Sequence, residues 1–191
     1  MRRRVTAALL LACVATGALA PAPLAVAEEP ASGTFTMTTA PGIMPAWTSA
    51  GISMSGIYPG SVTTSRFAND ATITLPVVAR EKTANATAGG FRITNTDTGT
   101  SVRCLIPVID TKALVIDCLT NDGFNIALFS IEEIQTRQSF TTPTTRTTLW
   151  RGMDLRLTTA GAQALNRALE TNVFSTSVRT AEGNLSVARD R

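Results

Sequence analysis

Histidine is absent from the 191-residue sequence, and its absence removes several classes of functional site. Without histidine there is no Ser-His-Asp triad, no Cys-His nucleophile pair and no histidine-bearing zinc or copper site. Glycine-rich phosphate-binding loops are also missing. The commonest hydrolases of the triad type are therefore excluded.

Charged residues are scarce, at 16% of the chain, with 17 Lys and Arg against 14 Asp and Glu. Three of the basic residues are Arg2, Arg3 and Arg4, and an apolar run over residues 7–20 follows them. The small-x-small pattern of residues 25–27 then matches the site that signal peptidase reads. We predict a signal peptide over residues 1–27, cleaved after Ala27.

Removal of this segment leaves fourteen acidic and fourteen basic residues, so the mature chain is neutral. Its basic residues form no cluster in the sequence, and this argues against a nucleic-acid partner. No later run reaches the roughly 18 apolar residues of a membrane span, so we expect no transmembrane segment in the mature chain. The predicted location is secreted or at the cell envelope; lipid attachment at Cys13, after Leu10-Leu11-Ala12, is an alternative.

The mature chain is long enough for one domain with a core of its own. We expect residues 28–34 to form a flexible tether and residues 35–188 to form a single domain. Within it, residues 72–77 alternate, which places Ile73, Leu75 and Val77 in the core. Pro76 then indicates an edge strand or a bulge.

Two apolar runs, residues 102–109 and 113–119, predict a β-hairpin. Pairing Ile109 with Ala113 sets Cys104 directly opposite Cys118, close enough for a cross-strand disulfide in an oxidising compartment. The same register puts the two cysteines and Ile106 on one apolar face. The alternative is that the two thiols stay unpaired and serve a redox or metal site. A metal site would need further ligands, and the sequence does not supply them.

The remaining patterns also indicate an all-β fold. A turn at Asn121-Asp122-Gly123 leads into a third strand, whereas the threonine-rich residues 135–148 suggest a long connection. Thr158 is a candidate N-cap for one short C-terminal helix at about 159–170. The expected fold is an antiparallel β-sandwich with this single helix.

Paired carboxylates are the remaining route to catalysis, because two of them suffice for glycoside hydrolysis. Glu132 and Glu133 are adjacent, so on a strand they would point to opposite faces, and Asp110 belongs to a turn. We therefore predict no enzyme and no catalytic residue. The full set of candidate carboxylates is Asp110, Asp117, Glu132, Glu133 and Asp154.

Other residues with binding chemistry have simpler structural interpretations. Trp47 and Trp150 suit a sugar-stacking face but are expected in the core, and Tyr58, beside Pro59, is expected in a turn or the core. We expect no metal site. Met37, Met44 and Met54 are expected to fill the core. Asn85 and Asn184 match glycosylation acceptor sequences and are expected at the surface.

Several segments, in order and spacing, resemble secreted actinobacterial proteins related to the haem-transport-associated (HtaA-like) domain. They are Gly89-Gly90-Phe91-Arg92-Ile93, Val108-Ile109-Asp110-Thr111, Asn121-Asp122-Gly123 with Ala127-Leu128-Phe129, and residues 157–166. The resemblance covers roughly residues 72–188. It implies a β-sandwich at the cell envelope and, in the haem-binding branch, iron held by tyrosine and assisted by histidine.

The sequence departs from the haem-binding branch, because it has no histidine and its one tyrosine, Tyr58, lies outside the resembling segment. We therefore expect no bound cofactor. The expected function is a non-catalytic binding or structural module with an unidentified envelope or extracellular partner. A carrier of haem or another small ligand, and a carboxylate-dependent secreted enzyme, are the alternatives.

Overall fold

The structure is a computed structural model that describes residues 29–65, 67 and 69–190. The predicted signal peptide, its cleavage after Ala27 and the alternative lipid site at Cys13 lie outside these residues. Within them, no helix is both long and apolar enough to cross a membrane.

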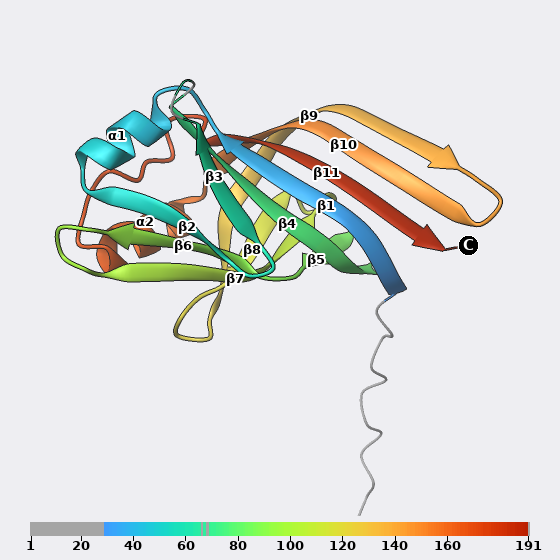
Figure 1. Ribbon diagram of the computed structural model, residues 1–191, viewed down its shortest axis with the longest axis horizontal. Coiled ribbons are helices and arrows are strands. Elements are labelled where there is room, and N and C mark those ends of the chain that lie inside the picture. The colour runs from blue at the N-terminus through green and yellow to red at the C-terminus, as the bar shows by residue number, and fades with distance from the viewer. Residues whose placement is uncertain (1–28, 66, 68, 191) are drawn as a thin grey trace, which may run out of the picture.

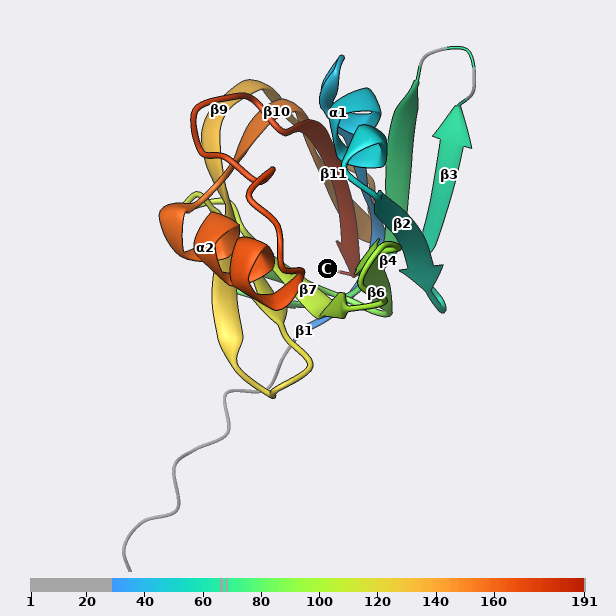
Figure 2. The same cartoon turned by 90° about the vertical axis from the view of Figure 1, so that its left-hand side faces the viewer.

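The described chain forms strands with two helices, and both helices lie at the same end of the molecule (Figures 1 and 2). In chain order the elements are β1 (Glu29–Thr39), α1 (Ile43–Ser49), β2 (Ile52–Ile57), β3 (Ser61–Ser65), β4 (Asp70–Glu81), β5 (Ala84–Thr87), β6 (Gly90–Asn95), β7 (Ser101–Asp110), β8 (Val115–Leu119), β9 (Asn125–Thr141), β10 (Thr145–Leu157), α2 (Thr159–Ala168) and β11 (Ala181–Asp190).

Eight antiparallel strands close into a barrel, in the order β7-β5-β4-β1-β11-β10-β9-β8. The pairing of β8 with β7 completes the ring, while β6 and β2 continue outward from β7 and β3 pairs with β4. The predicted β-sandwich is therefore wrong. Strands with one buried face show the same alternation in a sandwich and in a barrel, so the pattern alone does not distinguish the two.

Closure depends on β5, a short strand that contains the polar residues Asn85 and Thr87. Asn85 and Thr87 of β5 are fully buried. Asn85 Nδ2 donates to the Ile109 carbonyl at 3.1 Å, and Thr87 Oγ1 donates to the Pro107 carbonyl at 2.8 Å. Asn85 is thus an interior residue and not the expected surface position, because these bonds offset the cost of its burial.

The β7–β8 hairpin has a different register from the predicted one. Ile109 pairs with Ile116, not with Ala113, and a bulge separates Leu105 from Val108. Ile106, in the bulge, has φ of 44° and is 52% exposed. A bulge adds one residue to a strand and thereby exchanges the inward and outward faces beyond it, so the expected burial of Ile106 is wrong.

The predicted disulfide between Cys104 and Cys118 is present, with 5.0 Å between the two Cα atoms. Both cysteines are buried, at 3% and 1% exposure. They are not directly opposite each other, because Leu105 pairs with Leu119. The disulfide links β7 to β8 on the core side of the barrel wall.

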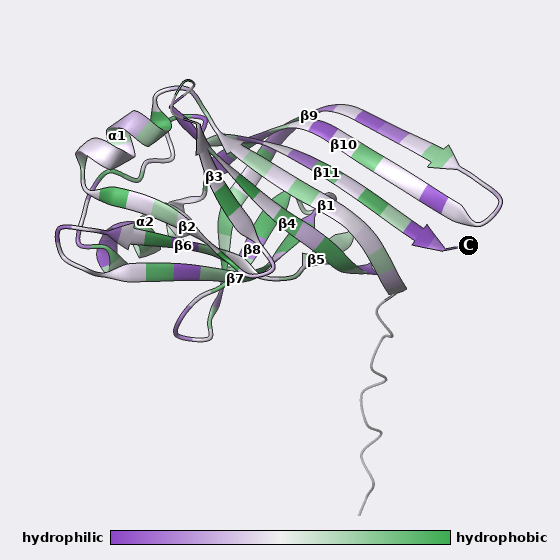
Figure 3. Ribbon diagram, in the orientation of Figure 1, coloured by the Kyte–Doolittle hydropathy of each residue, from purple (hydrophilic) through white to green (hydrophobic). Residues whose placement is uncertain are grey.

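The barrel core follows the alternation expected for β4: Ile73, Leu75 and Val77 are all buried. Pro76 lies in an inner strand of the sheet rather than at an edge, and a bulge follows it between Val77 and Ala79. Figure 3 shows hydrophobic residues recurring along the barrel strands.

Two segments expected to be irregular are regular strands. Residues 29–34, predicted as a tether, belong to β1, which pairs with β4 and β11. Residues 135–148, predicted as a connection, form the end of β9, the turn at residues 142–144 and the start of β10. Threonine is a common turn residue but also favours extended backbone, and β9–β10 pairing decides between the two.

The C-terminal helix, α2, is present as predicted, with Thr158 as its N-cap. Helix α1 was not predicted. It has only seven residues, contains Pro45, and packs Trp47 against Phe174 with 5.0 Å between ring centroids. A helix this short depends on such packing more than on its own propensity.

Thr158 joins α2 to β9, because its hydroxyl accepts from Gly161 N–H at 2.9 Å and donates to the Ala127 carbonyl. Replacing Thr158 with alanine is expected to lower the free energy of unfolding by about 1–2 kcal/mol, since an N-cap and a second bond are lost. Urea unfolding measures this change. A Thr159→Ala variant, one residue into the exposed start of the helix, is the matched control and should change stability far less.

Candidate functional site

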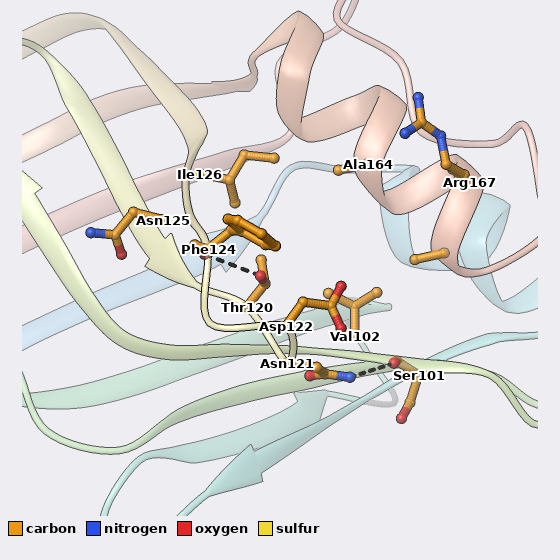
Figure 4. Close-up of a pocket in the computed structure, with 11 residues that line it drawn as sticks. Ser101, Val102, Thr120, Asn121, Asp122, Phe124, Asn125, Ile126, Ala164 and Arg167 are labelled. Atoms are coloured by element: carbon orange, nitrogen blue, oxygen red, sulfur yellow. Dashed lines mark hydrogen bonds between the residues drawn. The ribbon is translucent and has the colours of Figure 1, made fainter.

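A pocket of about 550 Å³ lies between the β8–β9 connection and α2 (Figure 4). Its volume falls within the range of small-molecule sites. One wall comes from β7 and the β8–β9 connection and the other from one face of α2. The lining residues are Ser101, Val102, Thr120, Asn121, Asp122, Phe124, Asn125, Ile126, Ala164, Arg167 and Ala168.

The hairpin wall is fixed by hydrogen bonds that follow from its turn sequence. Gly123 has φ of 78°, a conformation that glycine adopts without strain. Thr120 donates to the Phe124 carbonyl through its backbone N–H at 2.9 Å and its hydroxyl at 3.0 Å. Asn121 accepts from the Arg103 N–H and donates to the Ser101 carbonyl. The turn is therefore attached to β7.

Phe124 is 72% exposed, which leaves a large apolar side chain in contact with water. The side chains of Phe124 and Ile126 extend from the hairpin toward α2 (Figure 4). Across from them α2 presents Ala164 and Ala168, whose small side chains leave the space open. The pocket thus has an aromatic wall and an aliphatic wall.

Six of the eleven lining residues are polar, so the pocket is amphipathic. Arg167 supplies a guanidinium from the last turn of α2, and Asp122 supplies a carboxylate from the hairpin turn. Ser101 and Thr120 add hydroxyl groups. Apolar side chains combined with polar groups that can orient a ligand are usual in sites for small molecules.

The predicted carboxylates do not form a catalytic pair in this pocket, and none of the five lines it. Glu133 lies opposite Asp154 of β10. Asp154 forms an ion pair with Arg179, with 2.8 Å between nitrogen and oxygen. Glu132 accepts a hydrogen bond from Ser130. Within the described residues no group of three or more acidic or cysteine side chains is placed to hold a metal ion.

Asp110 and Asp117 lie on neighbouring strands and influence each other. Partial burial, together with the charge of Asp110, raises the pKa of Asp117. Partial burial acts to raise the pKa of Asp110 too, but hydrogen bonds from the N–H groups of Ala113 and Lys112 and from Thr83 outweigh it, so this pKa is lowered. These shifts follow from the β7–β8 turn and require no catalytic role.

The aromatic and sulfur-containing candidates lie outside the pocket. Trp47 and Trp150 are buried, as predicted, and cannot stack on a sugar. Tyr58 lies in the β2–β3 turn and is 93% exposed. Met37 and Met44 are core residues, as expected. The pocket residues were not predicted from the sequence. The signal that marks them is the Asn121-Asp122-Gly123 turn followed directly by an aromatic residue, Phe124, and this turn was interpreted only as the start of a strand.

Two solved structures share this architecture. The C-terminal domain of HtaA from Corynebacterium glutamicum aligns with a TM-score of 0.51 at 9% identity, over 84% of this chain and 99% of that domain. The heme-binding protein HtaB from the same organism aligns with a TM-score of 0.50 at 12% identity, over 84% and 95% of the two chains. The chain has the HtaA-like fold. The resemblance proposed from the sequence is thereby confirmed for the fold, over more of the chain than residues 72–188.

No protein-family model and no curated protein sequence matches the chain. At 9% and 12% identity, the likeness to these structures shows the fold alone. The ligand of this chain has to be inferred from its own residues.

Proposed function

We propose that this HtaA-like chain is a non-catalytic carrier of a small amphipathic ligand, bound between Phe124 and α2. The observation that carries the proposal is the pocket of about 550 Å³ with an exposed phenylalanine held at its wall. A planar apolar ligand that covers Phe124 and Ile126 would remove their surface from water. Arg167 favours an acidic group on that ligand.

HtaB is a heme-binding protein, so haem is one candidate ligand, and its fit depends on an iron ligand. Tyr58 does not line the pocket, both cysteines of the described chain are in the disulfide, and histidine is absent. The pocket residues therefore supply none of the usual axial ligands. A metal-free planar acid suits this pocket better than iron-ligated haem.

We further propose that the carrier acts outside the cytoplasm, secreted or at the cell envelope. The N-terminal sequence pattern of a signal peptide supports this location, and so does the buried disulfide, since disulfides persist in oxidising compartments.

The fluorescent probe 1-anilinonaphthalene-8-sulfonate tests the ligand site, because it combines a planar apolar body with an anionic group. Titration of residues 28–191 should show saturable fluorescence enhancement, and Phe124→Ala should weaken the affinity about tenfold through loss of the aromatic contact. Phe140→Ala removes an aromatic side chain that is 54% exposed on β9 and outside the pocket, and is the matched control. Equal affinity in the wild type and Phe124→Ala would refute the site.

Protein–protein recognition is a second candidate function, favoured by the strands outside the ring. Among the described strands, β2 pairs only with β6 and β3 only with β4, so each leaves an open edge. Tyr58 projects from the turn between them. Open edges and exposed aromatic side chains are common features of docking surfaces.

A further inference from the structure

The tip of the β9–β10 hairpin is rich in threonine and lies apart from the barrel core. The hairpin extends beyond the packed barrel, on the side away from the two helices (Figure 1). Six of the eight residues at positions 141–148 are threonine, and Pro143 stands in the turn. Residues 138–144 are all exposed, so burial in the core does not account for this composition.

The threonine hydroxyls of the tip differ in what they contact. Thr142 holds the turn, because its Oγ1 donates to the Thr145 carbonyl at 3.2 Å and accepts from the Thr145 N–H at 3.0 Å. The side chain of Thr144 bonds only to the Thr145 hydroxyl, at 3.5 Å, and that of Thr141 bonds to no described residue. The Thr141 and Thr144 hydroxyls are therefore accessible without loss of a backbone contact.

Pro143 favours the backbone conformation of a peptide that a modifying enzyme can bind. Its ring removes one backbone donor and keeps the preceding residue, Thr142, out of the helical region. Threonine-rich segments with proline are typical of O-glycosylated chains. The two asparagine acceptor sequences offer no comparable site, because Asn85 is fully buried and the Asn184 side chain accepts from the Gly152 N–H.

The same tip carries an open strand edge without charge. The register of β8 and β9 ends at Ser130, and beyond it β9 pairs with β10 alone in the described chain. This edge has charged residues as far as Arg137 but none from 138 to 145, and Phe140 is 54% exposed there. Uncharged open edges pair readily with other chains, so a bulky polar group at the tip would protect the protein.

We propose that Thr141 and Thr144 are O-glycosylation sites, at which a transferase outside the cytoplasm attaches neutral hexose units. In each transfer, the threonine Oγ1 attacks the anomeric carbon of a sugar carried on a phosphate. The bond from that carbon to the phosphate oxygen breaks, the phosphate leaves with the electron pair, and the hydroxyl proton passes to a base of the transferase. The attached glycan is bulky and soluble and covers the edge at Phe140.

Mass spectrometry of the exported chain tests this inference, which rests on the proposed export and not on the Phe124 pocket. The full-length chain is produced in the organism that encodes it and purified from the culture medium and the envelope fraction. Its mass should exceed that of the polypeptide by whole hexose units, and electron-transfer fragmentation should place them on Thr141 and Thr144. The double variant Thr141→Ala and Thr144→Ala should lose all of them. Both side chains are exposed, so the fold should persist.

Thr159→Ala is the matched control, because Thr159 is an exposed threonine at the start of α2. This variant should carry the same hexose mass as the wild type. Exported chain with unmodified Thr141 and Thr144 would overturn the inference, and so would full hexose mass in the double variant. A chain found only in the cytoplasm would contradict the proposed export and, with it, this inference.

Discussion

Replacing Trp150 with alanine is expected to lower the free energy of unfolding by about 3–5 kcal/mol. Trp150 is among the largest fully buried side chains, and Arg80 and Arg137 both rest on its ring. The substitution removes a large apolar volume from the barrel interior and leaves a cavity that β9, β10 and β11 are too tightly paired to fill. Urea unfolding followed by circular dichroism measures the change.

Phe140→Ala is the control for this substitution, because it truncates an aromatic side chain on β9 that is 54% exposed. It should change the free energy of unfolding by less than about 1 kcal/mol. A small effect of Trp150→Ala, comparable with that of Phe140→Ala, would contradict the packing of the barrel interior described above.

Removal of the disulfide is expected to have the second largest effect, a loss of about 2 kcal/mol in the double variant Cys104→Ala and Cys118→Ala. A closed loop of this size contributes about 3 kcal/mol on chain-entropy grounds, but the β7–β8 ladder already restricts the same loop. Loss of two buried sulfur atoms adds a packing cost.

Reduction of the wild-type disulfide separates the covalent bond from the packing. Reducing agent should destabilise the wild type by most of the same amount and should leave the double variant unchanged. Equal sensitivity of the two proteins to reducing agent, or a wild type that is insensitive to it, would contradict the structural role of the bond.

The elements that could be predicted from the sequence are those with a strong local signal. The alternation of β4, the Asn121-Asp122-Gly123 turn and the Thr158 cap each fix a short piece of backbone through the residues present. The disulfide was predicted from a register that was wrong. It nevertheless forms, because the bulge at Ile106 shifts the strands in a way that still brings Cys104 near Cys118.

Barrel closure was not predictable from these signals, because it depends on strand order. The polar strand β5 joins β4 to β7, and the side chains of its buried residues Asn85 and Thr87 donate to carbonyls 24 and 20 positions away in the chain. The same limit applies to the candidate site. Phe124 and Arg167 line one pocket only because α2 packs beside the β8–β9 hairpin.

The location of the bound probe tests the central proposal most directly. Titration of ¹⁵N-labelled residues 28–191 with 1-anilinonaphthalene-8-sulfonate, followed by amide chemical shifts, should perturb residues 101–102, 120–126 and 164–168. The same shifts should be absent in Phe124→Ala. Perturbations centred on Tyr58 or on the ends of β9–β11, with residues 120–126 unaffected, would contradict a ligand site between Phe124 and α2.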